Sequence, residues 1–156
     1  MRLHLLAVGT RVPHWVETGF AEYSARLPRH LRPVLHEIPT EARRGAGPAD
    51  RYRAKECERI LDAVPKGAAL VALDGRGRSW STAELAERLR AWMSAGRDLA
   101  LAIGGPDGLD PHCLERAEEQ WSLSALTFPH ALVRVIVAEQ LYRAWTLIEG
   151  HPYHRA

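Results

Sequence analysis

Short aliphatic runs alternate along this chain with longer segments of helical periodicity, and this alternation restricts the fold more than any other feature. The runs that are short and aliphatic enough to be strands are 3–8, 34–38, 68–73, 99–103 and a weaker one at 122–126. The segments with helical periodicity are 13–26, 49–64, 81–95, 111–119 and 130–149. Because strands that alternate with helices form parallel sheets covered on both faces, the sequence predicts a three-layer α/β fold.

Capping residues mark several of the expected helix ends. Ser81 followed by Glu84 forms a capping-box pattern, and Asp110 precedes a proline at a first helical position. Gly96 and Gly150 follow the ends of two helical segments, where a left-handed residue is commonly needed. These signals support the helix boundaries independently of the apolar periodicity.

The length and composition of the chain fit one globular domain spanning residues 1–156. With 46% hydrophobic and 26% charged residues, the composition excludes a disordered chain. The longest apolar runs, 5–8 and 99–103, are far shorter than the roughly 20 residues that span a bilayer. The N-terminal residues have the pattern of a buried strand and lack that of a signal peptide, so we expect no membrane association and a cytoplasmic location.

Charge is distributed unevenly along the chain, although the formal net charge is only +2. Residues 1–78 carry 14 Lys+Arg and 9 Asp+Glu, whereas residues 79–156 carry 7 and 10. A polyanion is therefore expected to prefer the first half, and a merely soluble surface is the alternative. Cys57 and Cys113 have no Cys-x-x-Cys partner, so we expect buried free thiols and no metal site.

The helix expected at 130–149 carries apolar residues on more than one face. Such a helix must be covered on several sides. In a chain of this size a second subunit can supply the extra cover, so the pattern favours a homodimer. The alternative is that the helix is enclosed by its own domain. Glu139 and Arg143 have the i,i+4 spacing of an ion pair on the more polar side of this helix.

The loop at 104–108 follows an apolar strand directly and contains three glycines. Ligands bind beyond the carboxyl ends of parallel strands, and glycines there allow a close approach to the backbone. An ordinary tight turn is the alternative interpretation. The loop is not G-x-G-x-x-G, and the chain has no G-x-x-x-x-G-K-[ST] motif, so nothing supports an NAD- or ATP-dependent enzyme.

Two further segments have the residue types of a binding site. Residues 121–130 combine aliphatic side chains, hydroxyls and backbone groups that suit an adenine, although a strand and turn is the alternative. The tail that follows Gly150 contains His151, Tyr153, His154 and Arg155, which suit an unpaired base and a phosphate. No third ligand accompanies the two histidines, so a metal pair is not favoured. A charged terminus without function remains the alternative for the tail.

Several motifs taken together are similar to those of one known family. They are Ala72-Leu73-Asp74-Gly75, the run 103–108, the run 121–127, Pro129-His130, Leu132-Val133-Arg134, the run 139–144 and the tail 151–155. In this combination the chain resembles the bacterial ribosomal large-subunit methyltransferase H family along its whole length. The resemblance implies a SPOUT-class methyltransferase, with a trefoil knot in a SAM-binding part at about 68–156. It also implies a homodimer that methylates N3 of a pseudouridine in 23S rRNA on assembled ribosomes.

The resemblance further implies which residues bind the cofactor, S-adenosyl-L-methionine (SAM). They are Leu73, Gly104, Leu123, Ser124, Ala125, Leu126, Thr127 and Phe128. Leucine is more usual in the family at the last of these positions, which affects one wall of the site.

Methylation of an imide nitrogen is easier once its proton has been removed, and His154 is the leading candidate base. Arg155 and Arg143 are candidates to stabilise the developing negative charge, or alternatively to bind RNA phosphate. Two other functions stay open at this point: a ribosome-binding protein without catalysis, and a SPOUT methyltransferase that acts on tRNA.

Overall fold

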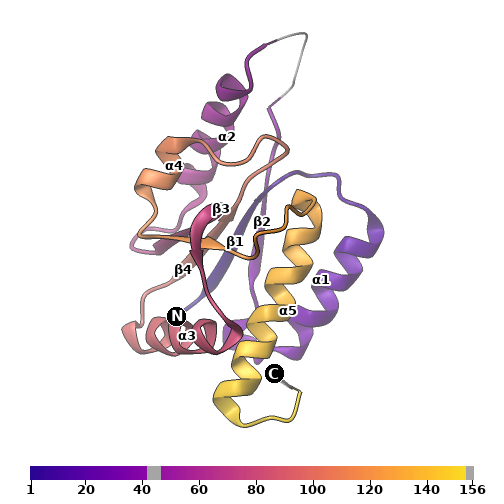
Figure 1. Ribbon diagram of the computed structural model, residues 1–156, viewed down its shortest axis with the longest axis vertical. Helices are drawn as coiled ribbons and strands as arrows, with labels where there is room; N and C mark the ends of the chain where they lie inside the picture. The colour runs from indigo at the N-terminus through magenta and orange to yellow at the C-terminus, as the bar shows by residue number, and fades with distance from the viewer. Residues whose placement is uncertain (42–46, 154–156) are drawn as a thin grey trace.

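Five parallel strands form one sheet at the centre of the molecule (Figure 1). The computed structural model describes residues 1–41 and 47–153 of the chain. The strands are β1 (Leu3–Val8), β2 (Val34–Ile38), β3 (Ala69–Ser79), β4 (Leu99–Ile103) and β5 (Glu119–Ser122). Their order across the sheet is β2-β1-β4-β3-β5, and every paired strand runs parallel to its neighbour.

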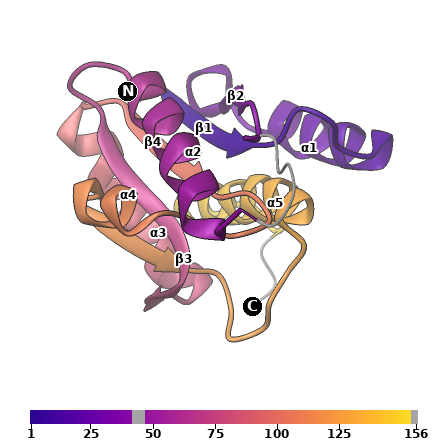
Figure 2. The same ribbon diagram turned by 90° about the horizontal axis from the view of Figure 1, so that it is seen from above.

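Helices cover both faces of this sheet (Figures 1 and 2). They are α1 (His14–Arg26), α2 (Ala49–Ala63), α3 (Thr82–Ala95), α4 (Pro111–Arg116) and α5 (His130–Glu149), with a short 3-10 helix η1 (Arg29–Leu31) after α1. Helices α1, α3 and α5 pack on one face, and α2 and α4 pack on the other. The predicted three-layer parallel α/β architecture is therefore confirmed.

The central strands are buried on both faces, as expected for a parallel sheet between two helical layers. In β4, Leu99, Leu101 and Ile103 belong to the core beneath α1, α3 and α5. Ala100 and Ala102 alternate with them and belong to the core beneath α2 and α4. This alternation fixes the register, because a shift of one residue would exchange the two faces.

The predicted helix caps are present in the structure. The Ser81 side chain accepts a hydrogen bond from the Glu84 amide, and the Glu84 carboxylate accepts one from the Ser81 amide. Asp110 caps α4 through the His112 amide. Gly96 and Gly150 adopt the left-handed conformation at the ends of α3 and α5, with φ of 72° and 70°. The helix boundaries thus follow from local side-chain chemistry.

Three predicted boundaries were wrong around β5. The strand covers Glu119–Ser122 instead of 122–126, α4 ends at Arg116, and β3 continues to Ser79 instead of ending at residue 73. The reason is a long-range contact: the buried Trp121 ring of β5 stacks on Trp80, which follows β3, with 5.2 Å between ring centroids. The aliphatic run that follows β5 lines a cavity instead of pairing with another strand.

The two cysteines are buried free thiols, as predicted, but they are not isolated from each other. Cys57 on α2 and Cys113 on α4 lie with their Sγ atoms 2.6 Å apart. Burial raises the pKa of both thiols above the usual value. The protonated form is therefore favoured, and the pair packs α4 against α2 instead of providing a nucleophile. No helix among the described residues is long and apolar enough to cross a membrane.

A buried arginine fixes the beginning of α5 above the ends of β1 and β2. The Arg134 guanidinium is 2% exposed, and it donates to the Gly9 carbonyl at 2.6 Å and to Glu37 Oε2 at 2.8 Å. Gly9 follows β1 with a φ of +123°, a conformation that L side chains rarely adopt. Although α5 is distant in the sequence, this contact joins its second turn to the carboxyl edge of the sheet.

We predict that Arg134→Met lowers the free energy of unfolding by about 2 kcal/mol, because the buried Gly9 carbonyl loses its charged donor without much loss of volume. Urea unfolding measures the difference. Arg97→Met is the matched control, since Arg97 pairs with Glu118 at a site where both side chains are about half exposed. The control should lose less than about 1 kcal/mol, and equal losses in both variants would contradict the prediction.

Candidate functional site

A cavity of about 470 Å³ opens at the carboxyl edge of the sheet, where β3, β4 and β5 lie next to one another. Its lining residues are Leu73, Asp74 and Gly75 from β3, Gly105, Pro106 and Gly108 after β4, residues 121–128 from β5 and the loop after it, and Val133 of α5. Other cavities on the molecule have similar volumes, so size alone does not select this one. Its position does, because ligands of parallel α/β proteins bind beyond the carboxyl ends of the strands.

The loop after β4 depends on two glycines for its close packing. A Cβ atom on Gly104 would lie 2.6 Å from the Gly108 carbonyl carbon, and one on Gly105 would lie 2.8 Å from a methyl group of Val8. The loop closes through a hydrogen bond from the Gly108 amide to the Gly105 carbonyl. Gly104, a predicted cofactor residue, is not among the lining residues; it permits the turn that places Gly105 on the wall.

Strand β3 has a bulge between Leu73 and Arg78, and both of these residues pair with Trp121 of β5. At the start of the bulge, Asp74 Oδ1 accepts hydrogen bonds from the Arg76 amide at 2.9 Å and from its Nε at 3.0 Å, while Oδ2 accepts from Nη2 at 3.3 Å. Hydrogen bonding by Arg76 lowers the pKa of Asp74 below its usual range. The bulge thus presents an ionised carboxylate on the cavity wall.

The loop after β5 contributes the largest part of the wall. The Ser122 hydroxyl donates to the Ser124 carbonyl at 3.1 Å, and the Ser124 hydroxyl accepts from the Leu126 amide at 3.0 Å. These local bonds hold an open loop in which Leu126 is 73% exposed. Every predicted cofactor residue from 123 to 128 lines the cavity, and so does Leu73.

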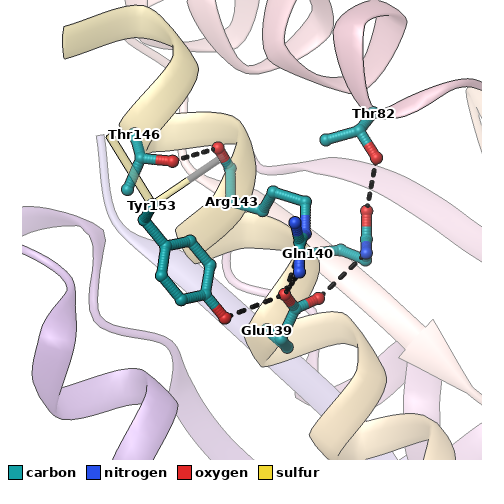
Figure 3. Close-up of polar contacts among 6 residues, drawn as sticks. All are labelled: Thr82, Glu139, Gln140, Arg143, Thr146 and Tyr153. Carbon is teal, nitrogen blue, oxygen red and sulfur yellow. Dashed lines mark hydrogen bonds and ion pairs between the residues drawn. The ribbon is translucent and has the colours of Figure 1, made fainter. Parts of the chain in front are cut away.

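Tyr153 of the tail lies against the middle of α5 (Figure 3). The Tyr153 hydroxyl donates to Glu139 Oε1 at 3.1 Å, and Arg143 Nε donates to the same oxygen at 2.9 Å, which confirms the predicted i,i+4 pair. The Tyr153 ring also packs on Tyr142, with 4.5 Å between centroids. Burial, followed by the charge of Glu139, raises the pKa of Tyr153 to about 12. The hydroxyl therefore remains a donor at neutral pH.

The structure does not bring Arg143, one of the predicted catalytic residues, to the cavity of its own chain. Arg143 lies ten residues beyond Val133 on α5, which corresponds to about 15 Å along the helix axis. Neither Arg143 nor Tyr153 lines the cavity. His154 and Arg155 lie outside the described residues.

Asp74 is the only ionisable side chain among the described residues that line the cavity, and sequence reasoning missed it. The signal was present in Leu73-Asp74-Gly75, but only Leu73 was selected as a binding residue. In the described part of the chain, no group of three or more His, Cys, Asp or Glu side chains could hold a metal ion. The apolar walls, glycines and single carboxylate fit a small organic ligand that carries positive charge.

Comparison with known proteins defines the class to which this fold and site belong. The family model described as "Predicted SPOUT methyltransferase" matches residues 1–154. Among solved structures, a Bordetella pertussis protein described as a probable methyltransferase superposes with a TM-score of 0.59 at 16% identity, covering 92% of this chain and 95% of the other. A Legionella pneumophila protein solved with bound SAM gives 0.50 at 13% identity, covering 92% and 66%. The chain is a SPOUT methyltransferase family member.

Curated relatives narrow this class further. A protein from Thioalkalivibrio sulfidiphilus is 58% identical over 99% of both chains, and one from Nitrosococcus oceani is 53% identical over 100% of this chain and 99% of its own. Both are named ribosomal RNA large subunit methyltransferase H. The chain therefore belongs to the ribosomal RNA large subunit methyltransferase H family, as its motifs indicated.

We predict that Gly77→Ala lowers the free energy of unfolding by about 2 kcal/mol, because the added Cβ would lie 2.5 Å from the Gln120 carbonyl carbon and would push β5 away from the bulge. Gly75→Ala is the matched control within the same bulge, since its Cβ would meet nothing within 4 Å. Urea unfolding should show a change within about 0.5 kcal/mol for the control. A control as unstable as Gly77→Ala would show that the bulge tolerates no side chain, contrary to this account.

Proposed function

We propose that the protein transfers a methyl group from SAM to N3 of a pseudouridine in 23S rRNA, on assembled ribosomes. The observation that carries the proposal is the cavity at the ends of β3, β4 and β5, whose wall contains Leu73 and the whole run 123–128. Relatives at 53–58% identity over nearly the whole chain, named for rRNA methylation, support the substrate class. The specific nucleotide and the assembled-ribosome substrate rest on the family resemblance.

The cavity supplies the surroundings that SAM requires. The loop at 123–128 offers backbone donors and acceptors for the edge of an adenine, and Leu126 and Phe128 offer apolar cover for its faces. When bound, SAM supplies an activated methyl group on its sulfonium. The protein then has to align the acceptor nitrogen with that methyl group and to exclude water.

Removal of the imide proton is the second requirement, because N3 is a weak nucleophile while protonated. His154 is our candidate base, and Arg155 and Arg143 are candidates to stabilise the negative charge that develops on the base ring. The pairing of Arg143 with Glu139 leaves its guanidinium 30% exposed, so the side chain retains access to solvent and to RNA.

We propose a homodimer, because it would explain why Arg143 lies far from the cavity of its own chain. Arg143 lies about 15 Å along α5 from the cavity of its own chain, so we propose that the tail of one subunit completes the site of the other. Many apolar residues of α5, including Leu132, Ile136 and Trp145, are only partly buried by their own chain, which leaves surface for a second subunit. Family membership also leads us to propose that residues 68–156 form the trefoil knot of SPOUT enzymes.

Methyl transfer from isotopically labelled SAM tests the function. The acceptors are assembled ribosomes from a strain without this modification, free 23S rRNA and tRNA, and mass spectrometry locates the product. We expect methyl-pseudouridine in 23S rRNA from assembled ribosomes. Ala125→Trp, which fills the cavity mouth, should reduce transfer more than tenfold, whereas Ala54→Trp on the exposed face of α2 should not.

Other products would overturn the proposal in distinguishable ways. A methyl group found on tRNA alone would assign the protein to a different substrate class. Ribosome binding without SAM binding or methyl transfer would instead indicate an rRNA-binding protein that lacks catalysis.

A further inference from the structure

The charge on the cavity wall comes from one residue, and its position suggests a role in cofactor selection. Among the described lining residues, Asp74 is alone in being ionisable, and its side chain is 12% exposed. We infer that Asp74 makes the cavity prefer the positively charged SAM over its neutral, demethylated product, S-adenosylhomocysteine. This inference rests on the proposed function, since it assumes that the cavity binds SAM.

Arg76 holds the carboxylate in place without occupying the cavity. Its backbone amide and Nε both donate to Oδ1, whereas Oδ2 receives a single, longer bond of 3.3 Å. Oδ2 therefore keeps most of its capacity to attract another positive group. The Arg76 side chain is 72% exposed and lines the neighbouring groove with Arg78 and Arg88, so it leaves the cavity open.

The Asp74 carboxylate is ionised at neutral pH. Hydrogen bonding by Arg76 lowers the pKa of Asp74, so neutral pH lies far above it. The backbone that carries Asp74 is fixed on both sides, because Gly77 lies against the Gln120 backbone and Leu73 is paired with Trp121. The wall thus carries an ionised carboxylate, paired with Arg76 outside the cavity, before any ligand enters.

The chemistry of the two ligands makes this charge selective. SAM and S-adenosylhomocysteine share the adenine, the ribose and the amino acid group, and they differ in the sulfonium, which becomes an uncharged thioether when the methyl group leaves. A carboxylate that held a ribose hydroxyl would bind both ligands equally well. A carboxylate that attracts the sulfonium charge raises the affinity for SAM relative to the affinity for the uncharged product. This difference promotes release of the product.

Isothermal titration calorimetry with SAM and with S-adenosylhomocysteine tests the inference on the full chain. Asp74→Asn should raise the Kd for SAM about tenfold and change the Kd for S-adenosylhomocysteine less than twofold. Asp62→Asn, on the exposed surface of α2, is the matched control for loss of one negative charge and should change neither value. Raising the salt concentration should reduce the preference of the wild-type protein for SAM.

Equal weakening of both ligands by Asp74→Asn, or no change in either, would overturn the inference while leaving SAM binding, and hence the proposed function, intact. A wild-type protein that binds neither ligand would overturn both. Sinefungin, in which a protonated amine replaces the methylated sulfonium, provides a test without a variant should Asp74→Asn fail to fold. The wild-type protein should bind sinefungin more tightly than S-adenosylhomocysteine at neutral pH, and the reverse order would contradict the inference.

Discussion

Parallel pairing of β4 with β1 on one side and with β3 on the other is the constraint on which the candidate site depends. It places the ends of β3, β4 and β5 at one edge of the sheet, so the loops that follow them converge on one cavity. The pairing is stable because β4 is buried on both faces between two helical layers. Arg134 joins α5 to the same edge of the sheet through its hydrogen bonds to Gly9 and Glu37.

Local patterns in the sequence predicted much of this fold. The strands at 3–8, 34–38 and 99–103 and the caps at Ser81 and Asp110 depend on neighbouring residues, so they could be derived from short segments. β5 could not, because its position depends on Trp121 stacking on Trp80, a contact between residues far apart in the chain. The contact between the two cysteines has the same long-range origin.

The residues of the candidate site also fall into those that local sequence patterns indicate and those that depend on long-range contacts. The loop at 123–128 was identified through its composition and its family resemblance, and its residues line the cavity. Asp74 was not selected although the run Leu73-Asp74-Gly75 contains it, because nothing in that run indicates the bulge of β3 against β5. Gly104, predicted to bind the cofactor, shapes the turn after β4, and its neighbour Gly105 reaches the cavity wall. The roles assigned to Arg143 and to the tail remain predictions, since they depend on a second subunit.

The sheet brings three loops together at one edge, and Arg134 fixes α5 beside them. The glycines let two of these loops pack closely around a cavity whose wall contains the ionised Asp74. We propose that this cavity holds the methyl donor, and a crystal structure of the protein with SAM tests this most directly. We predict adenosine density between Leu73 and the loop at 123–128. Density in another cavity, such as the groove beside Arg78 and Arg88, would contradict the proposal.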